Sequence, residues 1–225
     1  MRNLAFSFLA AALLPTAAFA DTSVINGHWP VIQGSGRIIR QVRPVGPFDR
    51  VELEDSTNLE VRLGSTRSLT IEADDNLLPL LTTEVRGDTL VLASHGSYRT
   101  RHNPRVWLTV PDLREVRLLG SGDVKLLGVA NAGLTLDIEG SGDVEAVGRT
   151  QMLNATIEGS GDFNLRGLYA RNARVRIEGS GDATVAVSDF LDASVAGSGD
   201  IRYSGHPGQV SVHRGGSGRV SSIGD

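Results

Sequence analysis

The chain has 225 residues, a formal net charge of −4, 27 glycines and no cysteine. Its mild acidity argues against nucleic acid or anionic lipid as a partner, because both are bound mainly through an excess of Lys and Arg. Without cysteine there are no disulfides, so stability depends on packing and backbone hydrogen bonds. The glycine content lies well above the usual share of about 7% and indicates a turn-rich β protein.

Residues 1–20 have the pattern of a secretory signal peptide. A positive charge at Arg2 precedes an apolar stretch over residues 4–14, and Ala18-Phe19-Ala20 provides a small-residue cleavage site. No later apolar run approaches the roughly 20 residues of a membrane helix, so no transmembrane segment is expected after cleavage. With no lipid or wall anchor recognised, we expect the periplasm as the location, and the cell surface or the extracellular space as alternatives.

Residues 21–47 are predicted to form a leader or N-terminal cap. They contain Gly34-Ser35-Gly36-Arg37, which resembles a turn that recurs later in the chain. Pro44 and Pro47 indicate a linker or an edge strand, because proline donates no hydrogen bond to a strand ladder. We place the start of the compact domain at Phe48.

Short strands with alternating apolar and polar residues are predicted from Val51 onwards, near residues 69–71, 90–92 and 106–110. Residues 55–58 match the later turn in register and are interpreted as a degenerate copy without its glycines. Residues 73–81 begin with potential capping residues before a leucine cluster, which predicts a short helical turn. The polar run 95–104 is predicted to be a loop.

The tetrapeptide Gly-Ser-Gly-Asp occurs five times between residues 120 and 200, at intervals of 20, 19, 20 and 18 residues. Such a period is typical of a solenoid, in which each turn buries its apolar face against the next. Apolar residues lie two and four positions before each tetrapeptide, and one and three positions after its Asp. Two strands and a connecting side in about 19 residues predict a three-sided parallel β-helix rather than a propeller.

The predicted fold class is therefore all-β, with a single-domain β-helix over residues 48–205. Arg214 stands where the earlier repeats carry Ile or Val, so residues 206–225 are predicted to be a frayed C-terminal cap.

The glycines at the first and third places of the turn are predicted to be structural. They permit positive φ in a tight corner, and stacking of the corners leaves no room for a larger side chain. They are Gly120, Gly122, Gly140, Gly142, Gly159, Gly161, Gly179, Gly181, Gly197 and Gly199.

The aspartates that end the turns are expected to form a column of carboxylates. Two unit charges about 4 Å apart repel by roughly 1 kcal/mol in water, so the column needs compensation. In one interpretation each carboxylate accepts hydrogen bonds from backbone N–H groups of its own or a neighbouring turn. In the other, calcium lies between the carboxylates. The calcium candidates are Asp123, Asp143, Asp162, Asp182 and Asp200.

No motif predicts a cofactor or a catalytic site. Acid pairs such as Asp137 with Glu139, or Asp143 with Glu145, recur with the repeat, whereas an active site breaks the symmetry in one coil. His95 and His102 flank the loop at 95–104 and would need further ligands to hold a metal, while His28 and His206 lie in the leader and the tail. Arg86-Gly87-Asp88, a tripeptide read by some cell receptors, is interpreted as part of a turn between two strands.

The repeated Ile-Glu-Gly-Ser-Gly-Asp, the segment Ile71–Leu78 and the opening Phe48-Asp49-Arg50-Val51 resemble the putative auto-transporter adhesin, head GIN domain family. The resemblance covers about residues 48–205. It implies a right-handed parallel β-helix in an exported bacterial domain, and it implies no catalytic residues. The name of the family suggests adhesion.

The leading functional hypothesis is an exported, non-catalytic β-solenoid that binds an envelope protein or a glycan through one of its faces. The alternatives are a structural envelope protein without a specific ligand, and a carbohydrate-active enzyme. Aromatic and basic residues outside the repeat pattern favour binding. These clusters are Tyr169 with Arg171, and Tyr98 with Arg99 and Arg101.

Overall fold

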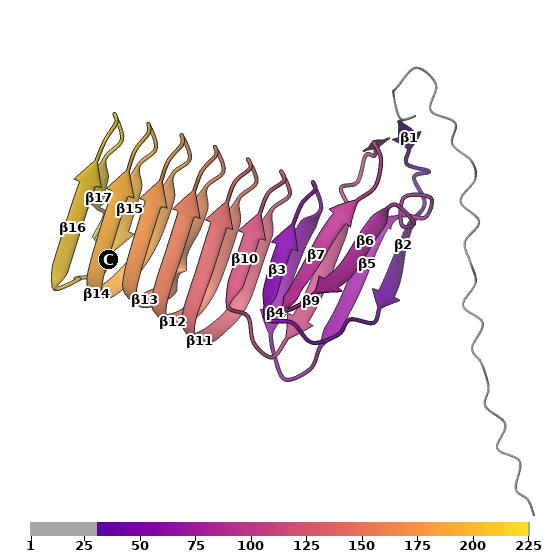
Figure 1. The fold of residues 1–225 in the computed structure, drawn as a ribbon, viewed down its shortest axis with the longest axis horizontal. Coiled ribbons are helices and arrows are strands. Elements are labelled where there is room, and N and C mark those ends of the chain that lie inside the picture. Colours follow the sequence, from indigo (N-terminus) through magenta and orange to yellow (C-terminus); the bar gives the residue numbers. More distant parts are fainter. Residues whose placement is uncertain (1–30, 225) are drawn as a thin grey trace, which may run out of the picture. The chain divides into compact units, whose positions relative to one another are not determined.

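The computed structural model describes residues 31–224, and the predicted signal peptide and His28 lie outside this range. The described residues form an all-β solenoid in which no helix occurs (Figure 1). Within residues 31–224 there is accordingly no helix long and apolar enough to cross a membrane. The fold class predicted from the repeat is confirmed.

Each regular coil consists of one long, bent strand and one Gly-Ser-Gly-Asp turn. The long strands are β11 (Val124–Ile138), β12 (Val144–Ile157), β13 (Phe163–Ile177) and β14 (Ala183–Val195). They stack in parallel, and their last residues follow one another in register. The chain rises on the near side in Figure 1, passes through the turns at the top and descends behind while advancing to the left, so the coil is right-handed.

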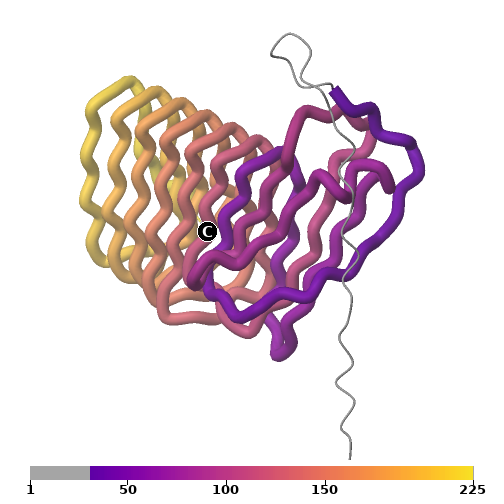
Figure 2. Tube along the Cα trace, turned by 45° about the vertical axis from the view of Figure 1, so that its right-hand side comes forward, coloured from indigo at the N-terminus to yellow at the C-terminus, as the bar shows by residue number. Residues whose placement is uncertain are grey.

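Each long strand bends twice, so its residues contribute to three sides of the solenoid. In β13 the alternation of buried and exposed residues breaks at Arg166-Gly167 and again at Arg171-Asn172. The first side therefore covers residues 163–166, the short second side 167–171, and the third side 172–177. The Gly-Ser-Gly-Asp turn makes the remaining corner, and the coils repeat regularly in Figure 2.

A continuous aliphatic column fills the solenoid. One of its rows contains Leu136, Ala155, Val175 and Ala193, all of which are at most 1% exposed. Each fully buried Val or Leu contributes about 1.5–3 kcal/mol relative to an exposed side chain, so stacking is the main source of stability.

The turns need glycine because they stack closely on one another, and not because of the backbone conformation at these positions. A Cβ at Gly161 would lie 2.0 Å from the carbonyl oxygen of Gly142 in the neighbouring coil, and one at Gly142 would lie 2.0 Å from that of Gly122. The predicted positive φ at these glycines is wrong, because the positive-φ glycines of the described chain lie elsewhere. Gly128 and Gly148, at bends of the long strands, are two of them.

The degenerate turn at residues 55–58 is confirmed. It joins β3 (Arg50–Leu53) to β4 (Asn58–Leu63), and these strands pair in parallel with β10 (Glu115–Leu118) and β11. However, the order of the coils in space differs from their order in the chain. The coil of β7 (Thr89–Ser94) and β9 (Arg105–Val110) stacks on the opposite side of β3 and β4 (Figure 1).

Antiparallel strands complete the N-terminal end of the stack. The edge strand β2 (Ile38–Arg43) pairs with β5 (Ser68–Asp74), which pairs with β9, while β6 (Leu81–Arg86) pairs with β7. The short strands β1 (Ile32–Gln33) and β8 (Tyr98–Arg99) pair in parallel, so the predicted loop at 95–104 contains a strand.

The short helical turn predicted over residues 73–81 corresponds to hydrogen-bonded turns at residues 75–80, which do not continue into a helix. Residues 75–80 form turns closed by hydrogen bonds from Leu77 N–H to the Asp74 carbonyl oxygen and from Leu80 N–H to that of Leu77, each 2.9 Å long. The Asp74 carboxylate caps no helix, because it accepts hydrogen bonds from Gly36 N–H and the Thr100 hydroxyl.

The frayed cap predicted over residues 206–225 differs from the structure, because one more coil follows β15 (Ile201–Ser204). In that coil β16 (Gln209–Arg214) pairs with β14, and β17 (Val220–Ser222) pairs with β15. Arg214 lies opposite Val195 in the last position of this row.

Candidate functional site

The turn aspartates form a ladder of hydrogen bonds along the solenoid. The backbone N–H of each aspartate donates to Oδ1 of the aspartate one coil earlier. The donor–acceptor pairs are Asp143 to Asp123 at 3.2 Å, Asp162 to Asp143 at 2.9 Å, Asp182 to Asp162 at 2.7 Å and Asp200 to Asp182 at 2.8 Å. This is the hydrogen-bonded arrangement that was one of the two interpretations. Among residues 31–224, no three Asp, Glu or His side chains converge so that they could hold a metal ion.

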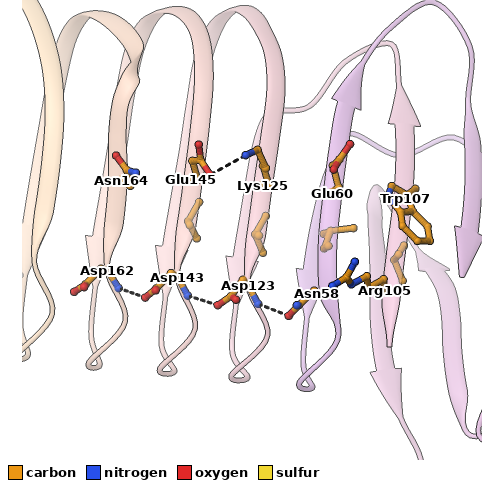
Figure 3. Close-up of a pocket in the computed structure, with 14 residues that line it drawn as sticks. Asn58, Glu60, Arg105, Trp107, Asp123, Lys125, Asp143, Glu145, Asp162 and Asn164 are labelled. Carbon is orange, nitrogen blue, oxygen red and sulfur yellow. Dashed lines mark hydrogen bonds and ion pairs between the residues drawn. The ribbon is translucent and has the colours of Figure 1, made fainter. Parts of the chain in front are cut away.

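A groove of about 500 Å³ runs beside this ladder on the first side (Figure 3). Lys125 Nζ lies 3.0 Å from Oε2 of Glu145 there. Trp107 lies at the N-terminal end of the groove, with the Arg40 guanidinium carbon 4.9 Å from the centroid of its ring. The groove therefore follows the repeat, and its lysine is already paired with a carboxylate.

The acid pairs considered for catalysis belong to the repeat only in part, because Glu139 and Asp143 have acidic equivalents in other coils. On the third side, Arg117 donates to Glu139 at 2.7 Å and to Glu52 at 2.9 Å. Burial raises the pKa of the nearby Asp137. Asp143 belongs to the ladder and Glu145 pairs with Lys125. The expectation that both acids of each pair recur is wrong. The register partners of Asp137 are Arg117 and Thr156. Those of Glu145 are Lys125 and Asn164.

The second aromatic cluster, Tyr98 with Arg99 and Arg101, is not brought together. Tyr98 packs against the hydrophobic core, and its hydroxyl is buried with no hydrogen-bond partner among the described residues. Arg99 and Arg101 instead line a hollow of about 590 Å³ beside Asp74. His102 lines the same hollow.

The tripeptide Arg86-Gly87-Asp88 lies at a hairpin turn, as predicted. Its glycine has a φ of 62° between β6 and β7. The Arg86 guanidinium binds Glu84 at 2.8 Å.

The first cluster, Tyr169 with Arg171, lies in a larger hollow of about 860 Å³ on the second side. We call this hollow the Tyr169 groove. Its lining comes from four consecutive coils and adds basic residues that the sequence did not single out. The principal side chains are Arg149, Gln151, Arg166, Tyr169, Arg171, Ser188, Asp189 and His206.

A shortened repeat creates the Tyr169 groove. The interval from Gly179 to Gly197 is 18 residues, two fewer than the preceding interval. Leu165 pairs with Val185, but the next pair along the strands is Tyr169 with Ala186, so residues 166–168 of β13 have no partners in β14. Ala186 is 4% exposed and forms part of the floor of the Tyr169 groove. The short interval was visible in the sequence and could have located this site.

Tyr169 is 63% exposed, and Arg149 is its register partner in the adjacent strand β12. Arg171 Nε lies 2.6 Å from Oδ2 of Asp189, and the Ser188 hydroxyl donates to Oδ1 at 2.8 Å. The hydrogen bond from Arg171, followed by that from Ser188, lowers the pKa of Asp189. Among the residues that the structure describes, Asp189 is the only acid that lines the groove, and it is therefore ionised and paired at neutral pH.

Comparison with known proteins gives a consistent family and fold. The family model described as putative auto-transporter adhesin, head GIN domain, matches residues 47–207. No curated protein matches the chain. A crystal structure of a putative adhesin from Bacteroides fragilis is 25% identical, with a TM-score of 0.71, over 85% of this chain and 100% of that one.

Two further crystal structures, at lower identity, show likeness of fold alone. A putative adhesin from Parabacteroides merdae is 19% identical, with a TM-score of 0.51, over 85% of this chain and 98% of that one. A putative lipid binding protein from Parabacteroides distasonis is 22% identical, with a TM-score of 0.50, over 86% of this chain and 100% of that one.

Proposed function

The chain belongs to the putative auto-transporter adhesin, head GIN domain family, and on this premise we propose that it is an exported, non-catalytic module that binds an envelope glycan in the Tyr169 groove. The family and the structural neighbours named adhesins support a binding role. The signal-peptide pattern of residues 1–20 supports export, with the periplasm as the proposed location.

The exposed ring of Tyr169 in a hollow of about 860 Å³ is the observation that carries this proposal. A Tyr side chain that is 63% exposed leaves most of its surface available for contact with a ligand. An aromatic ring can pack against the C–H face of a sugar, while neighbouring planar polar groups bind the hydroxyls. Gln151, Arg171 and Asp189 supply such groups around Tyr169.

The groove also has the position expected of a binding site on a solenoid. The core, the turn glycines and the aspartate ladder repeat from coil to coil and serve the stack. The Tyr169 groove breaks this repetition at one place, where the coil between Gly179 and Gly197 is short. Rigid stacked strands hold its walls, which limits the entropy lost when a ligand binds.

Affinity electrophoresis in native gels that contain soluble polysaccharides tests this function. The panel holds neutral, carboxylated and sulfated chains, and it is run with the wild-type protein, Tyr169→Ala and the control Met152→Ala. Met152 is 42% exposed and does not line the groove. We expect retardation of the wild type and of Met152→Ala, and at least a tenfold weaker affinity for Tyr169→Ala, which corresponds to about 1.4 kcal/mol. Migration of the wild type unaffected by every polymer would overturn the proposal.

A further inference from the structure

We infer that the Tyr169 groove selects a polysaccharide that carries acidic groups, and that Arg149 and Arg166 bind those groups. This inference rests on the proposed glycan-binding function and names the chemical class of its ligand. The observation that supports this inference is that some basic side chains on the coils are paired with carboxylates and others are not.

Most basic side chains on the coils between residues 115 and 204 are paired with carboxylates. The paired ones are Arg117 with Glu52 and Glu139, Lys125 with Glu145, Arg171 with Asp189, Arg174 with Asp192, Arg176 with Glu178, and Arg202 with Asp182 and Asp200. Arg149 and Arg166 make no ion pair with any residue of the described chain. Both are exposed, and both line the Tyr169 groove.

The two arginines lie beside the aromatic ring from two different coils. Arg149 is the register partner of Tyr169 in β12, one strand spacing of about 4.8 Å away. Arg166 lies three residues before Tyr169 in β13, at the bend that the short neighbouring coil leaves without partners. A ligand that packs on Tyr169 therefore has a guanidinium within reach on each of two sides.

The charge of the groove remains positive after its own acid is counted. Asp189 is held by Arg171 and Ser188 at 2.6 and 2.8 Å, so it does not neutralise Arg149 or Arg166. The whole chain, in contrast, has a formal net charge of −4. A local positive site on an acidic protein selects an anionic ligand while the rest of the surface repels non-specific ones.

Guanidinium groups match this class of ligand in geometry. Their planar, fixed N–H donors bind carboxylate, sulfate or phosphate through two hydrogen bonds at once, and they hold their charge at every physiological pH. An acidic polysaccharide combines such groups with sugar rings for Tyr169. An anionic membrane surface would use the arginines without needing a hollow beside an aromatic ring, so we commit to the polysaccharide.

Polygalacturonate and its fully methyl-esterified form provide a matched pair of probes, because they share one backbone and differ in charge. We expect the wild-type protein to bind polygalacturonate and to bind the ester at least tenfold more weakly. Dextran sulfate against dextran gives the same comparison for sulfate, and it distinguishes carboxylate from sulfate as the favoured acid. Binding to the charged polymer should weaken as the salt concentration rises.

The double variant Arg149→Gln/Arg166→Gln should lose at least tenfold in affinity for the charged polymer. The control Arg174→Gln/Arg176→Gln removes the same charge from the third side of the β13 coil, where both arginines are exposed, and should bind like the wild type. Circular dichroism melts of both variants verify that the fold is retained.

The possible failures are distinguishable. Equal binding of the charged and esterified polymers, still weakened by Tyr169→Ala, would overturn the acidic ligand and leave the glycan-binding function intact. An equal loss in the two double variants would show a non-specific charge effect and overturn the assignment to Arg149 and Arg166. Arginine-dependent binding to vesicles of anionic phospholipid, without binding to any polymer, would overturn both proposals.

Discussion

The backbone N–H of Asp182 donates a 2.7 Å hydrogen bond to Oδ1 of Asp162, one coil earlier in the solenoid. At the head of the same row, Asp123 N–H donates at 3.1 Å to Oδ1 of Asn58, which is a neutral amide oxygen. The ladder therefore needs a carbonyl-type oxygen at each step, and its first step works without a negative charge.

We predict that Asp162→Ala destabilises the protein by about 1 kcal/mol, because it removes the acceptor of a backbone N–H. Asp162→Asn should leave the stability unchanged or slightly higher, since it keeps the oxygen and removes repulsion between stacked carboxylates. Urea unfolding followed by circular dichroism measures both values. If Asn were as damaging as Ala, and added calcium raised the midpoint of the wild type alone, the carboxylate charge would be needed and calcium binding would regain support.

Substitution of a turn glycine should destabilise the protein more than substitution of a turn aspartate. Gly161→Ala should cost several kcal/mol or prevent folding, because its Cβ would lie 2.0 Å from the backbone oxygen of Gly142 in the preceding coil, which cannot move without separating the stack. Gly46→Ala is the matched control, since nothing lies within 4 Å of a Cβ there. Thermal melts of both variants measure the difference. A Gly161→Ala protein as stable as the Gly46→Ala control would show that the turns are less tightly stacked than described.

The regular coils could be predicted from the sequence because each Gly-Ser-Gly-Asp fixes the register of the apolar residues around it. The degenerate turn at residues 55–58 was recognised in the same way. The position of the coil formed by β7 and β9 could not be predicted, because its alternating residues fit either side of β3 and β4 equally well. Arg149 and Arg166 were missed because they come from different coils and share no motif. Only the short interval after Gly179 indicated where they meet.

The raised pKa of Asp137 predicts that the stability of the protein depends on pH. Burial is the main cause that raises its pKa, with Glu115 and Glu139 also raising it, while Thr156 and Arg117 lower it. An acid with a raised folded-state pKa contributes stability that is fully present below the ordinary Asp value of about 3.9 and is lost as the pH rises through the folded-state pKa. Asp137→Asn should therefore raise the melting temperature at pH 7, and this gain should shrink as the pH falls towards the ordinary value.

Melts of Asp137→Asn and the wild type across this pH range test the sign. Asp88→Asn serves as the control, because Asp88 is exposed in the β6–β7 turn and its carboxylate makes no hydrogen bond or ion pair with the described residues. A gain for Asp137→Asn that grew on acidification would contradict the prediction.

Restoring the missing length of the short coil should close the Tyr169 groove. Insertion of Asn-Gly between Val185 and Ala186 returns the interval after Gly179 to the length of the preceding one and gives two of residues 166–168 of β13 partners in β14. The inserted residues would occupy the space above Ala186, so we expect the affinity for polysaccharide to fall at least tenfold. The melting temperature should stay close to that of the wild type, because the buried rows on either side keep their register. An insertion variant that melts like the wild type and still binds polysaccharide with full affinity would show that the hollow left by the short coil does not form the binding site.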